Sequence, residues 1–449
     1  MIIGDYESWG RFPKYKPFDV FSVYWRNEIP DLSKFPKKIL PFAWGKSYGD
    51  TCLNEDGILI DTKNLSKFIS FDEETGLLRC EAGVTLASIL DFFVPRGWFL
   101  SVTPGTKFIS VAGAVANDVH GKNHHNSGTF GCHVTKFELV RSSGERLICS
   151  SEENTELFKA TIGGLGLTGL ITWVEFKLKS CPSAFFAMES EKFYNVDEFF
   201  EINTKSEKKF DYTVSWVDCT SSGSRLGRGI YNRGNHAHPD DYELPKLPKQ
   251  KLKSFPFDAA FINSATVNLF NMLYFNKQIN RIEKNIIHYD PFFYPLDAVL
   301  HWNKAYGKNG FLQYQFVVPY GNEKESVKEI LKQVSGSGMS SFLTVLKTFG
   351  DMKSPGMLSF PRPGVTMAID FRMGGEKTLK FLERLDSIVR ESGGVLYPAK
   401  DARMSAEDFQ RFYPQWTEFE NYIDPAFSSS FWRRVTKNEL TVNNSQLTF

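Results

Sequence analysis

Residues 103–130, with the sequence TPGTKFISVAGAVANDVHGKNHHNSGTF, combine a run of small residues with a cluster of histidines. His120, His124 and His125 can bind a metal, exchange protons or donate hydrogen bonds. Ahead of them, residues 110–116 are small and uncharged. Backbone N–H groups in such a run can approach a ligand closely, which suits a pyrophosphate. The same run also fits a buried turn that binds no ligand.

Three interpretations of the histidines remain open. His120 and His124 have the i, i+4 spacing of helical metal sites, but the flanking glycines and Asn123 oppose a helix, and no carboxylate or Cys pair is spaced as a further ligand. We therefore expect no metal. Alternatively, backbone amides hold the pyrophosphate of a flavin and His120 lies beside its ring. In the third interpretation the histidines are hydrogen-bonded inside a loop. Because His124 and His125 point in opposite directions, at least one of them is expected to be structural.

A second glycine-rich run, GGLGLTG at residues 163–169, fits the pattern G-x-G-x-x-G. The dinucleotide fingerprint requires a strand before this pattern and a helix after it. Here a helix is predicted before it, at 155–162, and a strand after it, at 170–178. The order excludes a Rossmann site and indicates a turn that ends a helix, either near a ligand or as a plain turn.

The elements around these motifs are short. The patterns predict a strand at 58–61, hairpins at 67–82 and 134–149, and a helix at 86–93 that Thr85 caps. Strands and hairpins with helices placed on them indicate an α+β lobe rather than an alternating parallel sheet.

The composition of the sequence changes after residue 183. A strand is predicted at 212–217, and residues 221–256 are rich in Gly, Pro and Lys, which predicts a mobile lid or a disordered segment. Residues 261–275 are apolar with aromatics, so they either lie on a lipid surface beside the preceding lysines or form a helix packed on its own domain.

From residue 311 to 397 the pattern is regular: strand, helix, two strands, helix, strand. This is the βαββαβ order of a ferredoxin-like unit with an antiparallel sheet. The pattern of the last fifty residues predicts amphipathic helices that return to the first domain. We expect a first domain at 1–182, a second at 183–394 with a mobile segment at 221–257, and a C-terminal segment at 395–449.

Composition narrows the class of protein. The chain has 449 residues, which predicts two or three domains, and a net charge of +1 without a long basic stripe, so no nucleic-acid partner is expected. The N-terminus lacks the apolar core of a signal peptide, and no apolar run of about 18 residues occurs. Six scattered cysteines without a C-x-x-C pair indicate reduced thiols in a cytoplasmic protein.

The loop PFAWGKSYGDT at 41–51, the central stretch and GGLGLTG, in that order, resemble the FAD-binding domain of the vanillyl-alcohol-oxidase/p-cresol-methylhydroxylase (PCMH) superfamily. The runs HGKNHH, FYPLD, WNKAYG, FLQYQF, LKTFG and YPAKDAR resemble its branch of polyprenyl-phosphate pentose oxidases. The resemblance covers nearly the whole chain. It implies an α+β protein with a two-lobed PCMH-type FAD-binding domain and a substrate domain on an antiparallel sheet of ferredoxin-like order.

The resemblance also implies the residues of the site. The positions implied to bind FAD are Phe42, Ala43, Trp44, Gly45, Lys46, Ser47, Tyr48, Gly49, Asp50, Thr51, Gly105, Ser110, Val111, Ala112, Gly113, Asn117, Asp118, Val119, His120, Ile171 and Tyr397. Those implied to face the substrate are Lys122, Trp216, Gln313, Gln315, Lys347 and Lys400. Lys400 would stabilise negative charge on the cofactor, and His120 or Lys400 would take the hydroxyl proton.

The implied reaction is oxidation of the C2′ hydroxyl of a polyprenyl-phosphate pentose to a ketone by hydride transfer to flavin N5. It would be the oxidase half of an epimerisation in cell-wall biosynthesis, completed by a separate NAD(P)H-dependent reductase. The lipid substrate implies peripheral contact with the inner face of the membrane. The alternatives are an aldonolactone or alditol oxidase acting on soluble sugars, and a flavin-binding protein without turnover.

Two departures from the superfamily pattern have consequences. Many members carry a flavin-attaching His in the first Gly-rich loop, where this chain has Lys46-Ser47-Tyr48, so we expect non-covalent FAD. Actinobacterial members have a Cys in the strand GVTMAIDF, where this chain has Ala368, and Thr366 also differs. These changes alter the expected wall of the substrate pocket.

Overall fold

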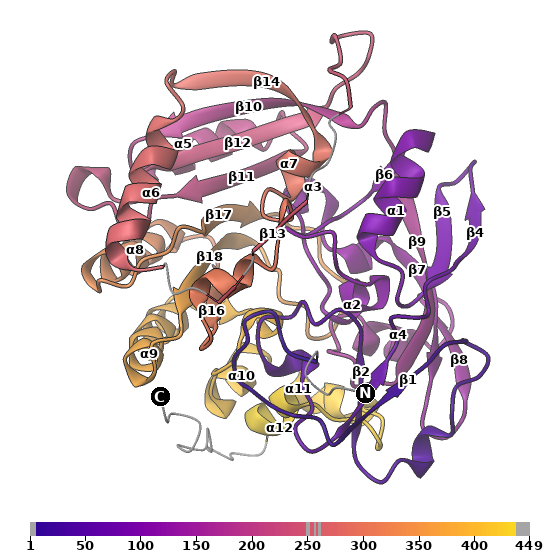
Figure 1. Ribbon diagram of the computed structural model, residues 1–449. Coiled ribbons are helices and arrows are strands. Elements are labelled where there is room, and N and C mark those ends of the chain that lie inside the picture. The colour runs from indigo at the N-terminus through magenta and orange to yellow at the C-terminus, as the bar shows by residue number, and fades with distance from the viewer. Residues whose placement is uncertain (1–5, 248–251, 256, 259–261, 437–449) are drawn as a thin grey trace.

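The structure, a computed structural model, describes residues 6–247, 252–255, 257–258 and 262–436. The described chain forms two lobes, each built on its own large sheet, with loops and short helices between them (Figure 1). Parts of the segments expected at 221–257 and 261–275 lie outside the described residues.

The first lobe is built on an antiparallel sheet with the order β4-β5-β9-β7-β8, and β6 pairs with β9. Its strands are β4 (Phe68–Asp72), β5 (Leu77–Glu81), β6 (Trp98–Leu100), β7 (Val134–Val140), β8 (Arg146–Ser150) and β9 (Leu170–Ser180). A small parallel sheet, which the sequence did not predict, consists of β1 (Asp19–Ser22), β3 (Ile58–Asp61) and β2 (Ile39–Phe42). The helices of this lobe are α1 (Leu86–Phe93), α2 (Val111–Ala116), α3 (His124–Ser127) and α4 (Thr155–Thr161).

The second lobe is built on an eight-stranded antiparallel sheet with the order β14-β10-β12-β11-β17-β18-β16-β19. Its strands are β10 (Phe185–Phe193), β11 (Tyr212–Val217), β12 (Gly229–His236), β14 (Ile282–His288), β16 (Phe311–Val318), β17 (Thr344–Phe349), β18 (Gly364–Arg372) and β19 (Val395–Leu396). Its helices are α5 (Val196–Ser206), α6 (Ser264–Asn276), α7 (Tyr289–Phe293), α8 (Glu323–Gly336) and α9 (Glu376–Glu391). A two-stranded pair, β13 (Lys253–Ser254) with β15 (Val299–Leu300), lies beside it.

This sheet contains the βαββαβ order twice. The elements β16, α8, β17, β18, α9 and β19 form the predicted ferredoxin-like unit, with its strands in the order second, third, first, fourth. The elements β10, α5, β11, β12, α6 and β14 repeat the same order, mirrored along the sheet. The two units join where the second strand of each meets, because β11 pairs with β17.

The second unit corrects one prediction from the sequence. Residues 221–256 were expected to be structureless, but residues 229–236 form β12, which pairs with β10 over eight positions and with β11 over six. Gly and Asn are uncommon in strands, so the sequence GIYNRGNH gave no strand signal. Pairing on both sides supplies the stability that its local sequence lacks.

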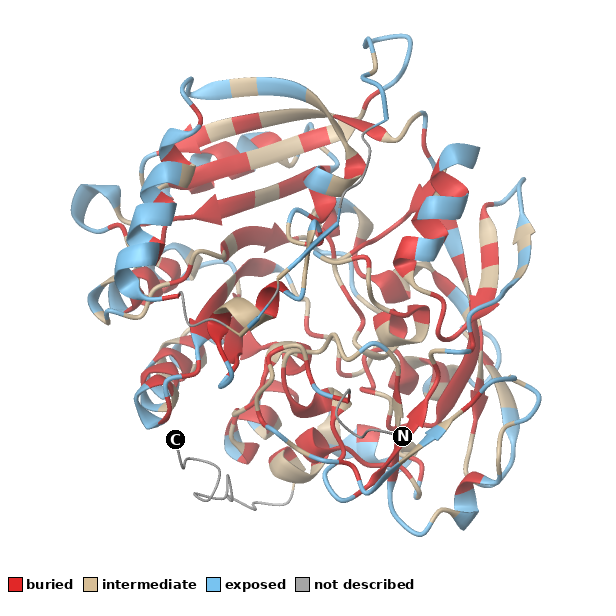
Figure 2. Cartoon of the chain, in the orientation of Figure 1, coloured by how far each residue is buried: buried red, intermediate tan, exposed pale blue. Residues whose placement is uncertain are grey.

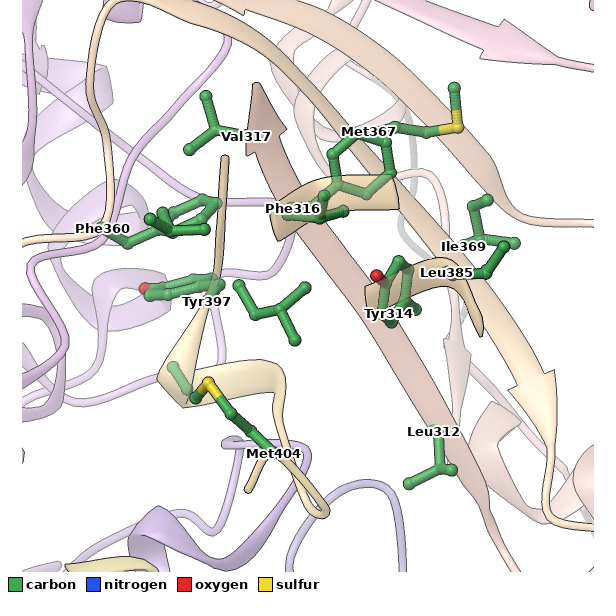
Figure 3. Packing of buried hydrophobic residues seen from close by; sticks show 14 of the residues in the cluster. Leu312, Tyr314, Phe316, Val317, Phe360, Met367, Ile369, Leu385, Tyr397 and Met404 are labelled. Carbon is green, nitrogen blue, oxygen red and sulfur yellow. The ribbon is translucent and has the colours of Figure 1, made fainter. Parts of the chain in front are cut away.

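Strand β16 is buried along its whole length. Residues on one face pack into the core under α9, where Figure 3 shows Leu312, Tyr314 and Phe316 beside Leu385. The other face carries Gln313 and Gln315, which are polar yet buried. Buried polar side chains need partners, so this face must meet other polar groups.

The C-terminal helices α10 (Ala406–Phe412), α11 (Trp416–Phe419) and α12 (Ser430–Thr436) lie in the lower middle of Figure 1, beside the small parallel sheet of the first lobe. The guanidinium of Arg434 in α12 binds the buried carboxylate of Asp50 at 2.7 Å and that of Asp401 at 2.9 Å. The backbone of Phe427 forms a parallel bridge with Ile39 of β2. The C-terminal segment thus contacts the first lobe. The domain boundaries at 182 and 394 stay predictions.

Candidate active site

Helix α2 and the turn after it are held by the second glycine-rich run. Ser110 caps α2 by accepting a hydrogen bond from the Gly113 N–H at 3.1 Å. In the run GGLGLTG, the N–H groups of Gly163 and Leu165 donate to the last carbonyls of α2 at 2.9 and 2.8 Å. The helix before this run and the strand after it are as predicted, and its role is to end α4 and fix α2.

The residues of α2 that face away from the core are small. Ala112, Gly113 and Ala116 are half-buried, and Gly105 ahead of them is exposed, with open space where a Cβ would lie. Ser110, Val111 and Val119 are buried beneath this face. The structure therefore leaves a small-residue surface of the predicted kind uncovered.

The first glycine-rich loop is fixed by close backbone contacts. A Cβ on Gly49 would lie 1.5 Å from the carbonyl oxygen of Asp401, so no larger residue fits there. Gly45 has a φ of +57°, and its Cβ would lie 2.5 Å from the carbonyl of Glu7. The N–H of Tyr48 donates to the Ala399 carbonyl at 3.0 Å, which draws the loop onto the segment that carries Lys400.

Lys400 and Tyr48 form one edge of the site. The Lys400 Nζ lies 3.6 Å from the centroid of the Tyr48 ring, a cation–π contact. Burial lowers the pKa of Lys400 to about 7, and the carboxylate of Asp370 opposes that change. Lys46 in the same loop lies 3.6 Å over the Trp9 ring, and burial lowers its pKa to about 8.

The imidazole of His120 lies between two other predicted site residues. Lys347 Nζ is 2.8 Å from its Nδ1, and Gln315 Nε2 is 3.1 Å from its Nε2. Lys347 also donates to the Gly121 carbonyl at 2.6 Å. Burial, followed by the charge of Lys347, holds the pKa of His120 well below its usual range, so the ring is neutral. A neutral imidazole has one donor and one acceptor nitrogen, so the ring can take up one proton.

Sheet register aligns two of the residues that were predicted to face the substrate, Gln315 and Trp216. Gln315, Ala368, Val345 and Trp216 are paired in turn across β16, β18, β17 and β11, so they form one row that crosses both βαββαβ units. The Trp216 indole donates to the Phe342 carbonyl at 2.9 Å. Ala368, where related chains were expected to have Cys, lies in the middle of this row.

Of three lysines in the site, Lys347 is buried and Lys122 and Lys400 are half-buried. Burial lowers the pKa of Lys122, Lys347 and Lys400 to about 7 each, and mutual repulsion contributes at Lys347. The Lys122 ammonium donates only to a backbone carbonyl, that of Phe292, among the hydrogen bonds of the described residues. So much buried positive charge with so little carboxylate fits a ligand that carries negative charge.

Two further observations fit the expected FAD. The buried side-chain oxygens Thr51 Oγ1 and Asn117 Oδ1, both in the predicted cofactor-binding set, have no hydrogen-bond partner in the described protein. The Tyr397 hydroxyl donates to the Asn117 carbonyl at 2.8 Å, and its ring stacks under Phe360 (Figure 3). Residues 42–51, α2 and the turn at 117–120 would therefore hold the cofactor.

Some predicted cofactor-binding side chains have structural partners instead. Asp50 binds Arg434, and Asp118 accepts hydrogen bonds from Ser354, Ser359 and the Gly131 N–H. Their carboxylates therefore position the two loops, and both residues are fully buried. Of the others, Phe42 and Ile171 are buried in β2 and β9, Ala43 and Ser47 are half-buried, and Trp44 is exposed.

The other histidines of the cluster, His124 and His125, contact residues outside the expected cofactor and substrate sets. His125 bonds to the Phe210 carbonyl at 2.9 Å, and His124 packs on the Phe349 ring at 4.5 Å. Burial lowers the pKa of His124 to about 3, so it is neutral. Helix α3 begins after Asn123, so His120 and His124 do not share a helix. No metal-binding group of His, Cys, Asp or Glu occurs in the part of the chain that the structure describes.

Sequence reasoning missed Asp370. It lies fully buried on β18 and accepts hydrogen bonds from Gln313 Nε2 at 2.6 Å and from the Tyr306 hydroxyl at 3.1 Å. The signal was present, because Asp370 is the one charged residue in the run GVTMAIDF. An ionisable side chain in an otherwise apolar strand indicates a paired or functional group.

Comparison with known proteins identifies the family. Residues 28–150 match the model of the FAD binding domain. The chain is 36% identical, over 408 residues, to decaprenylphosphoryl-β-D-ribose oxidase of Mycolicibacterium smegmatis, covering 87% of each chain. It is 31% identical to a putative D-arabinono-1,4-lactone oxidase of Neurospora crassa over 34% of this chain and 27% of that one. It is 30% identical to cytokinin dehydrogenase 5 of Arabidopsis thaliana over 24% and 21%.

The extent of the first match decides between these relatives. It spans both lobes, including the strands that carry Gln313, Lys347 and Asp370, whereas the other two are local. The FAD binding domain, the buried lysines around His120 and the α+β architecture all agree with it. The protein is an FAD-dependent oxidoreductase, and its chain belongs to the decaprenylphosphoryl-β-D-ribose oxidase family.

Proposed function

We propose that this protein oxidises the C2′ hydroxyl of a polyprenyl-phosphate pentose, such as decaprenylphosphoryl-ribose, to a ketone. The observation that carries the proposal is a group of three lysines, the buried Lys347 and the half-buried Lys122 and Lys400, together with the buried amides of Gln313 and Gln315. Ammonium groups suit a phosphate, and amides suit sugar hydroxyls, which both donate and accept hydrogen bonds. The similarity to an oxidase of decaprenylphosphoryl-ribose supports the same substrate class.

Oxidation of a secondary alcohol removes a hydride from carbon and a proton from oxygen. Bound FAD supplies the hydride acceptor. The neutral His120 takes the hydroxyl proton. Gln315, 3.1 Å from its Nε2, and Lys347, 2.8 Å from its Nδ1, fix the orientation of the ring. Lys400 places a positive charge at the edge of the site. There it would stabilise the negative charge that reaches the cofactor with the hydride. Lys347 and Lys122 hold the phosphate.

A series of aromatic rings supports a lipid-linked substrate. From Lys400 the contacts run through Tyr48, Phe311, Tyr306, Phe342, Phe270, Tyr274 and Trp216, with centroid separations between 4.2 and 5.8 Å. The last rings belong to, or touch, α6. Its fully buried residues are Val267, Asn271 and Phe275, and the rings of Phe270 and Tyr274 contact Phe342 and Trp216. An apolar chain leaving the site along these rings would reach the outer face of α6.

The outer face of α6 is apolar and uncovered, as the exposed helix at the upper left of Figure 2 shows. Leu269, Phe270, Met272 and Leu273 are exposed, Leu273 by 59%. The helix has no acidic residue, and Lys277 follows it. We propose that this face contacts an anionic membrane surface, because apolar side chains beside a cation favour the lipid interface. In the described part of the chain, no helix is long and apolar enough to cross a bilayer.

The keto sugar must be reduced for an epimerisation to be complete. We therefore also propose a separate NAD(P)H-dependent reductase as the functional partner. Supplying such a reductase with the oxidation product should yield the epimeric alcohol, whereas return of the starting sugar alone would exclude this role.

Anaerobic reduction of the bound FAD tests the substrate proposal. The visible absorbance of the purified holoenzyme should bleach with a polyprenyl-phosphate ribose and not with D-arabinono-1,4-lactone or a free alditol. Bleaching by the lactone or alditol alone would assign the protein to the soluble-sugar oxidases. Bleaching by none of them would favour a flavin-binding protein without turnover.

Flotation with anionic vesicles tests the membrane proposal. The double variant Leu269→Glu, Leu273→Glu should lose most vesicle binding, while Phe92→Glu on the first lobe should bind like the wild type. Phe92 is the control because it is also an exposed apolar side chain, at 43% against 54% for Leu269 and 59% for Leu273. Equal binding by both variants would exclude α6 as the contact.

A further inference from the structure

Asp370 is a buried carboxylate that contacts the predicted site residue Gln313. The proposed reaction gives it no role. It faces Gln313 across the β16–β18 pair, where the two residues are in direct register. Its carboxylate is wholly enclosed and accepts hydrogen bonds from Gln313 and Tyr306. Enclosing a carboxylate costs free energy, so its retention inside an apolar strand calls for a compensating role.

Asp370 determines how Gln313 is oriented. Burial raises the pKa of Asp370 to about 7, so its carboxylate is ionised above that pH. An ionised carboxylate can only accept hydrogen bonds, so there the Gln313 amide must turn its NH₂ group towards Asp370 at 2.6 Å. The Gln313 carbonyl oxygen then faces the other way. The Tyr48 side chain, which lies under Lys400, interacts with the same amide. Gln313 is thereby fixed as a hydrogen-bond acceptor on the side of Tyr48 and Lys400.

Asp370 also acts on the charge of Lys400. Burial lowers the pKa of Lys400, and Asp370 is the group that raises it again. The titratable groups that face Asp370 are Lys400 and the hydroxyls of Tyr306 and Tyr48. Lys347 and His120 also interact with Lys400, and the positive charge of Lys400 lowers the pKa of both. A neutral residue at position 370 would remove the interaction that raises the pKa of Lys400, so that pKa would fall further.

We infer that Asp370 is a positioning residue for the reaction: it fixes Gln313 as the acceptor that orients the sugar hydroxyl, and it keeps Lys400 charged. This inference rests on the proposed function, because the hydroxyl that Gln313 meets belongs to the sugar. Asp370 itself touches neither substrate nor cofactor in this scheme. Its effects pass through Gln313 and Lys400.

The variant Asp370→Asn tests this inference, because it keeps the shape of the side chain and removes the charge. An amide can donate as well as accept, so Gln313 loses its single orientation. The limiting rate of FAD reduction by a polyprenyl-phosphate ribose should fall about tenfold or more at pH 8, the scale expected for one lost oriented hydrogen bond. The loss of rate with rising pH should begin about one pH unit lower than in the wild type. The apparent Kd should change by less than about threefold.

A second readout needs no substrate. Titration of a charge at the site perturbs the visible absorbance of bound FAD, and the midpoint of that change should fall by about one pH unit in Asp370→Asn. Tyr306→Phe removes one hydrogen bond from Asp370, so it should shift both pH profiles in the same direction by less. Tyr314→Phe is the matched control, because Tyr314 lies on β16 between Gln313 and Gln315 and faces the opposite side.

Wild-type rate and pH profile in Asp370→Asn would overturn the inference. If that variant does not retain FAD, Tyr306→Phe decides instead, and an unshifted profile overturns it. Failure of every polyprenyl sugar to reduce the wild type would refute the proposed function. The absorbance titration without substrate would then still test whether Asp370 controls a charge at the site.

Discussion

Replacing Lys400 by methionine should lower activity and raise stability together. Burial takes the pKa of Lys400 from its usual 10.5 to about 7. The pKa of Lys400 is lower in the folded protein than in the unfolded chain. The charged ammonium therefore destabilises the fold at every pH at which the unfolded chain is protonated. This cost is absent above about pH 10.5, grows as the pH falls, and is complete below about pH 7. The difference in pKa sets its upper limit at about 5 kcal/mol.

Other contacts of Lys400 offset part of that cost. The cation–π contact with Tyr48 contributes about 1 kcal/mol, and methionine retains most of the buried volume. We therefore expect a gain in unfolding free energy of about 1–3 kcal/mol at pH 6 and none at pH 10. Reduction of FAD by substrate should slow by about two to three orders of magnitude, as when one preorganised charge-stabilising group is removed.

Two measurements check this prediction. Thermal unfolding of the holoenzyme at pH 6 and pH 10 should show a higher Tm for Lys400→Met at the lower pH only. Anaerobic stopped-flow reduction should show the loss of rate, which Lys400→Arg restores only in part because its planar fork displaces the charge. Lys34→Met is the control, since Lys34 is 81% exposed. Reduction of Lys400→Met at the wild-type rate would refute charge stabilisation, and a lower Tm at pH 6 would refute the burial cost.

Three further outcomes are expected. Acid precipitation should leave yellow FAD in the supernatant, since Tyr48 stands where a flavin-attaching His would be; colour in the pellet would contradict non-covalent binding. Lys347→Met should raise the apparent Kd for the lipid-linked sugar at least tenfold and leave the limiting reduction rate nearly intact, which stopped-flow titration separates. Burial lowers the pKa of His236 to about 3, so stability should fall as the pH drops below 6.5. His236→Phe should lessen the drop in Tm between pH 7 and pH 5, and an unchanged drop would exclude His236 as its source.

The elements predicted from sequence were those with strong periodicity. Helices α8 and α9 repeat apolar residues at helical spacing, and β16 and β18 are apolar runs between turn residues. Strand β12 was missed because Gly and Asn carry no strand signal, and its place depends on pairing with two distant strands. Missing that strand also hid the repetition of the βαββαβ order.

The glycine-rich loops of the site were predicted from the sequence, and the site lysines from the family resemblance. Neither source predicted which residues contact the lysines. His120 and Lys347 are 227 positions apart, and nothing in either neighbourhood shows that they meet. The partner of Asp118 is equally distant, since Ser354 follows it by 236 positions. Such pairs depend on the docking of two lobes. Which nitrogen of a buried ring is protonated depends on those pairs, so the chemistry could not be assigned before the fold.

The ion pair between Asp50 and Arg434 has a consequence for the order in which the protein folds. The two residues are 384 positions apart, and the Asp50 carboxylate is fully enclosed in the finished protein. On the ribosome, the loop that carries Asp50 emerges long before its partner. An unpaired enclosed carboxylate is costly, so this loop should remain open until α12 is synthesised. FAD would then be captured late, when the last helix closes the loop that is expected to hold it.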